Sequence, residues 1–84
     1  MESNVVLEQL FMDADAEIKA KNIEVAIEKL QEILAIDPHF GKAYNHLGWI
    51  EETKFQNYSE AERLYKLALQ YAPHYLSVYY NYSI

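Results

Sequence analysis

Apolar residues recur at every third or fourth position along most of this 84-residue chain. That spacing places them on one face of an α-helix. Polar stretches interrupt the pattern at Lys21 and Asn22 and again at residues 54–57, which predicts a short turn at each place. The pattern therefore predicts four helices, joined in two antiparallel pairs. Their apolar runs cover residues 7–18, 23–34, 44 onward and 58–72.

Local signals predict where these helices start and stop. Proline lacks an amide donor and disfavours helical geometry in the residue before it, so Pro38 and Pro73 should end the second and fourth helices. Ser59, followed three positions later by Glu62, has the spacing of a capping box and predicts a helix start at Ser59. After Pro73, the apolar and aromatic residues of 76–84 predict a fifth helix.

The chain also repeats itself. Residues in the second predicted helix recur 35 positions later in the fourth, whereas Leu10 and Ala14 recur 34 positions later as Tyr44 and Gly48. The unit is therefore 34 residues long, and the second unit holds one inserted residue between Gly48 and Tyr58. The residues shifted by 35 are Ile23, Ala26, Leu30, Ile33 and Pro38, which recur as Tyr58, Ala61, Tyr65, Ala68 and Pro73.

The repeat has a recognisable residue pattern. Tyr44 precedes Leu47-Gly48, Ala61 precedes Tyr65 by four positions, and a proline closes the unit. This pattern resembles the tetratricopeptide repeat, and the first unit fits it less closely. The resemblance implies that Gly48 is small because the two helices of a unit approach closely there.

The same resemblance implies an all-α fold, an α–α superhelix or helical-hairpin solenoid of two repeat units plus a terminal fifth helix. Residues 1–84 would form a single domain. Unit 1 would occupy about 7–40, unit 2 about 41–75, and residues 76–84 would be a partial third unit or a capping helix.

The composition argues against disulfides, metal sites and catalytic groups in such a fold. The chain is 51% apolar and 24% charged, as globular domains are, and it has no cysteine for a disulfide or a thiolate metal site. His39, His46 and His74 have no partner at the spacing of metal ligands or of a catalytic pair. We therefore expect no metal, no cofactor, no catalytic residue and no enzymatic activity.

The net charge of the chain argues against two classes of binding partner. Thirteen acidic residues against 7 basic ones give a formal net charge of −6, which repels nucleic acid and anionic membranes. The chain has no cationic leader and no apolar run of about 20 residues. We expect a cytoplasmic protein that binds neither nucleic acid nor a membrane.

In tetratricopeptide proteins the first helix of each unit lines a concave groove, and the resemblance implies that a peptide or protein segment binds there. The positions at which relatives of this kind grip a partner's terminal carboxylates hold no lysine or arginine here, and Asp15 would repel a carboxylate. These positions are Phe11, Asp15, His46, Ser77 and Asn81. An acidic, aromatic groove favours a basic or amphipathic segment instead. The expected partner-binding residues are Phe11, Asp15, Asn45, Trp49, Glu52 and Tyr80.

Two alternatives remain open at this stage. In the first, Trp49 packs within its own chain instead of projecting into the groove. Seven of the eight tyrosines lie at Tyr58 or beyond, so the Tyr-rich segment 76–84 could join copies of the protein into a homo-oligomer. That second function would be structural self-association.

Overall fold

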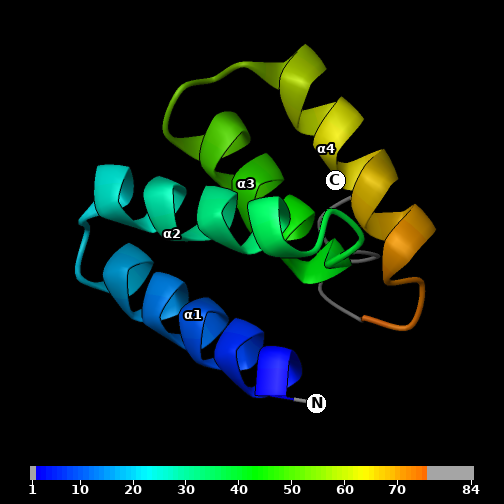
Figure 1. Ribbon diagram of the computed structural model, residues 1–84. Coiled ribbons are helices and arrows are strands. Elements are labelled where there is room, and N and C mark those ends of the chain that lie inside the picture. The colour runs from blue at the N-terminus through cyan, green and yellow to red at the C-terminus, as the bar shows by residue number, and fades with distance from the viewer. Residues whose placement is uncertain (1, 76–84) are drawn as a thin grey trace. The chain divides into compact units, whose positions relative to one another are not determined.

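A computed structural model describes residues 2–75 of the chain. Within that range the chain forms four α-helices and no strand (Figure 1). The predicted fifth helix at 76–84 lies outside the described residues, and Tyr80 lies there too. The helices are α1 (Glu2–Lys19), α2 (Ile23–Ile36), α3 (Gly41–Thr53) and α4 (Tyr58–Tyr71).

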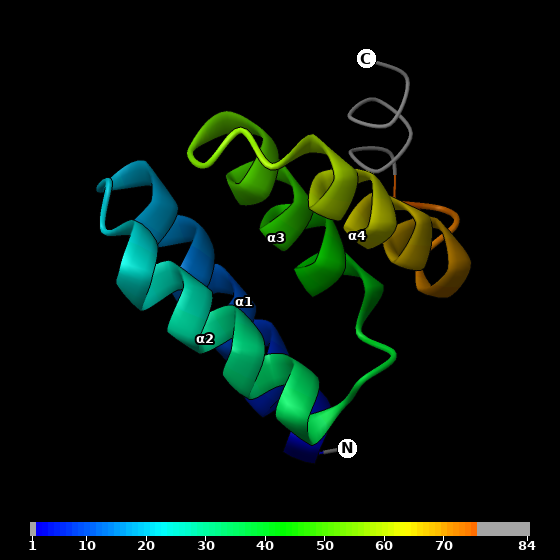
Figure 2. The same cartoon turned by 90° about the horizontal axis from the view of Figure 1, so that it is seen from above.

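The chain divides into two compact units, Met1–Pro38 and His39–Ile84. In the first unit α1 packs against α2, and in the second α3 packs against α4, each pair as an antiparallel hairpin (Figure 2). The predicted all-helical class and the pairing of the helices are confirmed. So are the two stops, because α2 ends one residue before Asp37-Pro38 and α4 ends one residue before Ala72-Pro73.

Each hairpin buries the apolar face that the sequence pattern predicts. Small residues are prominent among the buried positions, which lets neighbouring helices approach closely. The first unit buries Leu7, Ala14, Ala26, Leu30 and Ile33, and the second buries Ala43, Ile50, Ala61, Leu64, Tyr65 and Ala68. None of the helices within residues 2–75 combines the length and the apolar run that crossing a membrane requires.

The two glycines lie where α3 meets α4. A Cβ atom added at Gly48 would lie 2.8 Å from two ring carbons of Tyr65, so the expected close approach at Gly48 is confirmed. Gly41, the first residue of α3, is tighter still. Its added Cβ would lie 2.6 Å from the Ala72 Cβ and 2.7 Å from the Ala72 backbone nitrogen. At both glycines of α3, a side chain would therefore clash with α4 or with the residue that follows it.

The turns within the two hairpins have a common design. Lys21 and Gln56 both adopt the left-handed conformation, with φ of 69° and 56°. The next residue in each turn is an asparagine whose backbone N–H donates to a glutamate carbonyl near the helix end. These bonds are Asn22 to Glu17 and Asn57 to Glu51, each 2.8 Å long. The first spans five residues and the second spans six, which places the predicted insertion in the α3–α4 turn.

Glycine should stabilise the first turn. Lys21 follows α1 with the paired hydrogen bonds of a Schellman motif, a position that favours glycine because a Cβ is unfavourable at positive φ. We expect Lys21→Gly to raise the free energy of unfolding by about 0.5–1 kcal/mol in urea denaturation. Lys29→Gly, inside α2, is the matched control and should lower it by about 1 kcal/mol. Equal destabilisation by both changes would contradict the assignment of the turn.

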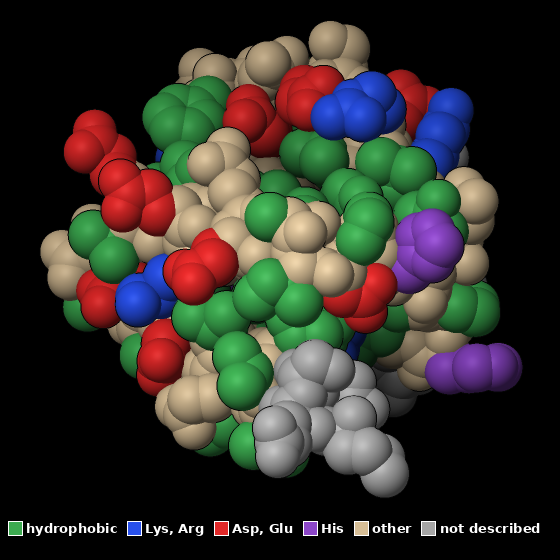
Figure 3. Space-filling view, viewed as in Figure 1, with side chains coloured by type: hydrophobic (Ala, Val, Ile, Leu, Met, Phe, Trp, Pro, Cys, Tyr) green, Lys and Arg blue, Asp and Glu red, His purple; other side chains and the backbone are tan. Residues whose placement is uncertain are grey.

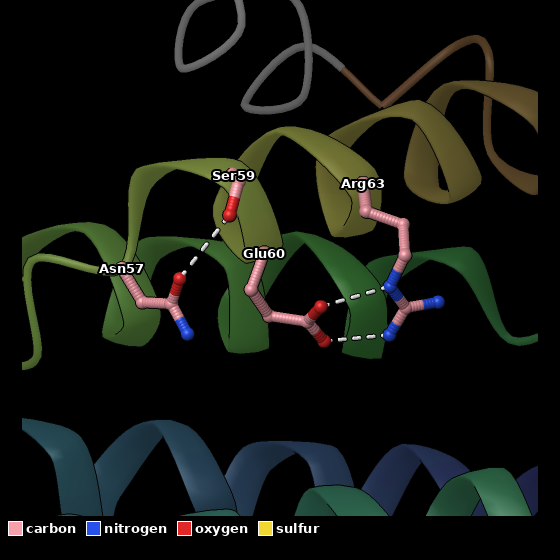
Figure 4. A network of polar contacts seen from close by, with 4 residues as sticks. All are labelled: Asn57, Ser59, Glu60 and Arg63. Atoms are coloured by element: carbon pink, nitrogen blue, oxygen red, sulfur yellow. Dashed lines mark hydrogen bonds and ion pairs between the residues drawn. The ribbon is translucent and has the colours of Figure 1, made fainter.

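The predicted capping box at the start of α4 is wrong. The helix begins at Tyr58, so Ser59 already lies inside it, and no side chain caps the helix through a hydrogen bond. The Ser59 hydroxyl instead lies 3.5 Å from the side-chain oxygen of Asn57 (Figure 4). Glu62 forms an ion pair with Lys66 at 3.4 Å. Asn57 takes the cap position because the turn closes through its backbone N–H, as it does at Asn22.

Candidate partner-binding surface

Trp49 lies on α3 and is half-buried. The Nζ atom of Lys54, just beyond the end of the helix, lies 5.5 Å from the centroid of the Trp49 ring system. That geometry is a cation–π contact, in which the face of the indole attracts a positive charge. The Thr53 hydroxyl donates a 2.7 Å hydrogen bond to the Trp49 carbonyl and occupies one acceptor at the helix end. The indole is therefore placed where a cation can reach its face.

Glu52 follows Trp49 by three positions, which puts the two side chains on neighbouring parts of the same helix surface. Its carboxylate accepts a 2.7 Å hydrogen bond from the hydroxyl of Tyr65 on α4. Tyr65 is 4% exposed. Burial, together with this bond to Glu52, raises the pKa of the Tyr65 hydroxyl well above its ordinary range. Glu52 thus joins α3 to α4 as well as contributing negative charge beside Trp49.

Removing the Tyr65 hydroxyl should weaken the second hairpin. Because the bond to Glu52 is charge-assisted and partly buried, we expect Tyr65→Phe to lower the free energy of unfolding by about 1–2 kcal/mol at neutral pH. Thermal or urea unfolding followed by circular dichroism measures the loss. Tyr58→Phe is the matched control, because Tyr58 is 65% exposed, and should have little effect.

The same bond predicts a pH dependence. The neutral hydroxyl is favoured in the folded chain, whereas tyrosine in the unfolded chain ionises near pH 10. The Tyr65 contribution is therefore complete below about pH 10 and declines as the pH rises further. The difference in stability between the wild type and Tyr65→Phe should shrink between pH 9 and pH 11. A difference that grows over that interval would contradict this sign.

The remaining predicted groove residues differ in how accessible they are. Phe11 is half-buried on α1, and Asp15 on the next turn of that helix forms an ion pair with Lys19 at 3.0 Å. Asn45 is only 2% exposed. The structure therefore brings Phe11 and Asp15 together on α1, and Trp49 and Glu52 together on α3. Asn45 offers almost no surface to a partner in this conformation.

Sequence reasoning missed an aromatic cluster at the end of the second hairpin where α3 begins and α4 ends. The His39 and Tyr71 rings stack with centroids 4.6 Å apart, and the Tyr44 ring lies 6.0 Å from that of Tyr71. Lys42 Nζ lies 5.6 Å from the Phe40 ring and 5.8 Å from the Tyr75 ring. The sequence pattern explained His39 only as a loop residue. The position of His39 next to Pro38, at the start of the second unit, was the sequence feature that could have indicated a contact with the end of that unit.

Charge is divided unequally between the two units. Residues 1–38 hold nine of the 13 acidic residues and three of the seven basic ones, whereas residues 39–84 hold four of each. The whole formal charge of −6 therefore lies in the first unit. Acidic and hydrophobic side chains are interspersed over α1 and α2 on the face that Figure 3 shows. The first unit is the part of the chain that would attract a cationic partner.

Ion pairs in the second unit join Glu60 to Arg63 and Glu62 to Lys66. The Arg63 guanidinium donates two hydrogen bonds to the Glu60 carboxylate, at 2.9 Å and 2.6 Å (Figure 4). These bonds hold the pKa of the Glu60 carboxyl below its ordinary value. Both groups face solvent, so the pair contributes little to stability.

Among residues 2–75, no three histidine, aspartate or glutamate side chains lie close enough together to hold a metal ion. The arrangement of Trp49, Lys54 and Glu52 is suited to recognition through an aromatic face and charge. Comparison with known proteins gives no match, either to a protein-family model or to a curated protein. The resemblance to tetratricopeptide repeats therefore rests on the residues of this chain alone.

Proposed function

We propose that this protein is a non-enzymatic interaction module that binds a basic or amphipathic segment of another protein. In this proposal the two helical hairpins are consecutive tetratricopeptide units that stack into a superhelix, and the first helix of each unit lines the binding groove. The module acts in the cytoplasm and uses no cofactor. Its mechanism is binding alone.

The contact between Lys54 and Trp49 carries the proposal. It supports the view that the indole face receives a cation, because a lysine of the chain itself already lies over it. Lys54 is exposed and sits at the end of a helix, so a partner's lysine or arginine could replace it at little cost. Glu52 beside Trp49, and Asp15 and Phe11 on α1, add the negative charge and the apolar contact that such a segment would use.

Trp49 is the only tryptophan of the chain, so its emission reports directly on this site. The experiment titrates the protein with three unstructured 12-residue peptides that share their apolar residues and carry Lys and Arg, no charge, or Glu. We expect the basic peptide to shift the Trp49 emission, the neutral one to bind more weakly, and the acidic one to leave the spectrum unchanged. Equal binding of all three peptides, or of none, would contradict the proposed function.

Trp49→Ala tests whether the indole is the anchor. We expect the basic peptide, labelled for anisotropy, to bind roughly 30-fold more weakly, which corresponds to about 2 kcal/mol for a buried aromatic anchor. Helicity should remain nearly unchanged. Phe55→Ala is the matched control, because Phe55 is an exposed aromatic residue of the same hairpin at 54% exposure. Unfolding by Trp49→Ala would show that the indole belongs to the core and not to a groove.

A further inference from the structure

The outward face of α1 carries an apolar stripe. Val5 is 71% exposed and Met12 is 62% exposed, and Ala16 is exposed as well. The exposed Gln9, whose amide donates to Asp13, is the one polar residue among them. At 100° per residue, these four positions fall within an arc of about 60° around the helix. The stripe lies opposite the buried side of α1, which includes Leu7 and Ala14. We call these four residues the α1 stripe.

Carboxylates flank the α1 stripe on both sides. The helical spacing places Asp13 and Glu17 along one edge, and Glu8 and Asp15 along the other. The Gln9 amide donates a 3.0 Å hydrogen bond to Asp13, and Lys19 forms a 3.0 Å ion pair with Asp15. Lys19 is the only basic residue of α1. An apolar strip between two acidic edges is thus displayed on the unit that holds the net charge of the chain.

The repeat allows this face to be compared with its counterpart on α3. A shift of 34 positions takes Gln9 to Ala43 and Ala16 to Ile50, and both of these are fully buried. The corresponding positions of α1 are exposed. Val5 and Met12 correspond to His39, which is exposed, and His46, which is partly exposed, so the α3 face is covered at Ala43 and Ile50 alone. In a helical protein such a face packs well against another helix, through ridges and grooves of side chains.

We propose that the α1 stripe is a docking surface for an amphipathic helix of a partner protein, one whose apolar face is flanked by lysine or arginine. The apolar positions of the partner cover Val5 and Met12, and its cations lie against Glu8, Asp13, and the other edge carboxylates. Charge selects this occupant over an acidic or neutral helix, because like charges along both edges would repel it. The proposal rests on residues of α1 and does not use Trp49.

The test uses a synthetic 18-residue helical peptide with leucine at positions i, i+3, i+4 and i+7 and lysine on either side. The control peptide has glutamate in place of every lysine. We expect the lysine peptide to bind the intact chain in fluorescence anisotropy, with affinity falling at least tenfold between 50 and 500 mM salt, and to slow hydrogen exchange in α1. Absence of binding, or equal binding of the glutamate peptide, would overturn the proposal.

Met12→Glu places a charge in the middle of the α1 stripe without touching the core, since Met12 is exposed. We expect this change to weaken binding of the lysine peptide at least tenfold while circular dichroism stays unchanged. Phe55→Glu, at an exposed aromatic position in the other unit, is the matched control and should bind normally. Unchanged affinity in Met12→Glu would overturn the proposal.

Two further outcomes separate this proposal from its competitors. Binding that is lost in Trp49→Ala and kept in Met12→Glu would assign the peptide to the Trp49 site, which would overturn the α1 proposal and leave the proposed function intact. Light scattering of the protein alone should show a monomer at 100 μM. A dimer that Met12→Glu dissociates would show that a second copy covers the α1 stripe, and would overturn the assignment to a cationic partner.

Discussion

Ile33→Ala is expected to lower the free energy of unfolding by about 2–5 kcal/mol. Ile33 lies on the inner face of α2 and is fully buried, so shortening it removes apolar contacts and leaves a cavity that neighbouring side chains fill only in part. A domain of ordinary size is stable by about 5–15 kcal/mol, so this change would consume a large share of the total. Urea denaturation followed by circular dichroism at 222 nm measures the loss.

Ile36→Ala is the matched control for this change. Ile36 has the same side chain, lies three positions further along the same helix, and is 49% exposed. Its replacement should cost less than about 1 kcal/mol, because little apolar surface leaves a packed environment. If the two changes destabilise the protein equally, the inner face of α2 is not the face assigned to it.

Gly41→Ala should lower the free energy of unfolding by about 1–3 kcal/mol, the usual range for overpacking. The added Cβ would lie 2.6 Å from the Ala72 Cβ and 2.9 Å from the Tyr71 carbonyl carbon, both far inside contact distance. Because these atoms include backbone, relief requires the start of α3 to move away from the end of α4. Thermal unfolding monitored by circular dichroism gives the change.

Two further substitutions test the reason given for the effect of Gly41→Ala. Adding Ala72→Gly removes one of the clashing atoms but leaves the Ala72 nitrogen 2.7 Å away, so it should restore only part of the lost stability. Gly48→Ala should cost less than Gly41→Ala, because it meets the side chain of Tyr65 and gains about 1 kcal/mol of helix propensity. Wild-type stability in Gly41→Ala would refute the close approach.

Much of the fold could be predicted because the determining signals are local. The spacing of apolar residues selects helices, and Pro38 and Pro73 stop them wherever they occur. The internal repeat located the inserted residue between Gly48 and Tyr58 from sequence shifts alone, and the structure places it in the α3–α4 turn. The first and third helices begin earlier than their predicted apolar runs, at Glu2 instead of residue 7 and at Gly41 instead of residue 44.

The predictions that failed or were missed depend on residues brought together by folding. The cap of α4 was assigned to Ser59 from spacing, yet the turn closes through the backbone N–H of Asn57, as the shorter first turn closes through that of Asn22. The bond between Glu52 and Tyr65 joins positions 13 residues apart, and no local pattern marks it. The burial of Asn45, which is 2% exposed, is likewise set by the folded chain and not by local spacing.

The two hairpin turns end in the same way although their lengths differ. In each turn an asparagine N–H donates to a glutamate carbonyl, five residues earlier in the α1–α2 turn and six residues earlier in the α3–α4 turn. Phe55, in the longer turn, is exposed to solvent. Loop closure entropy grows only slowly with length. The α3–α4 connection is consequently the natural place to graft a recognition peptide or a reporter tag while both flanking helices keep their register.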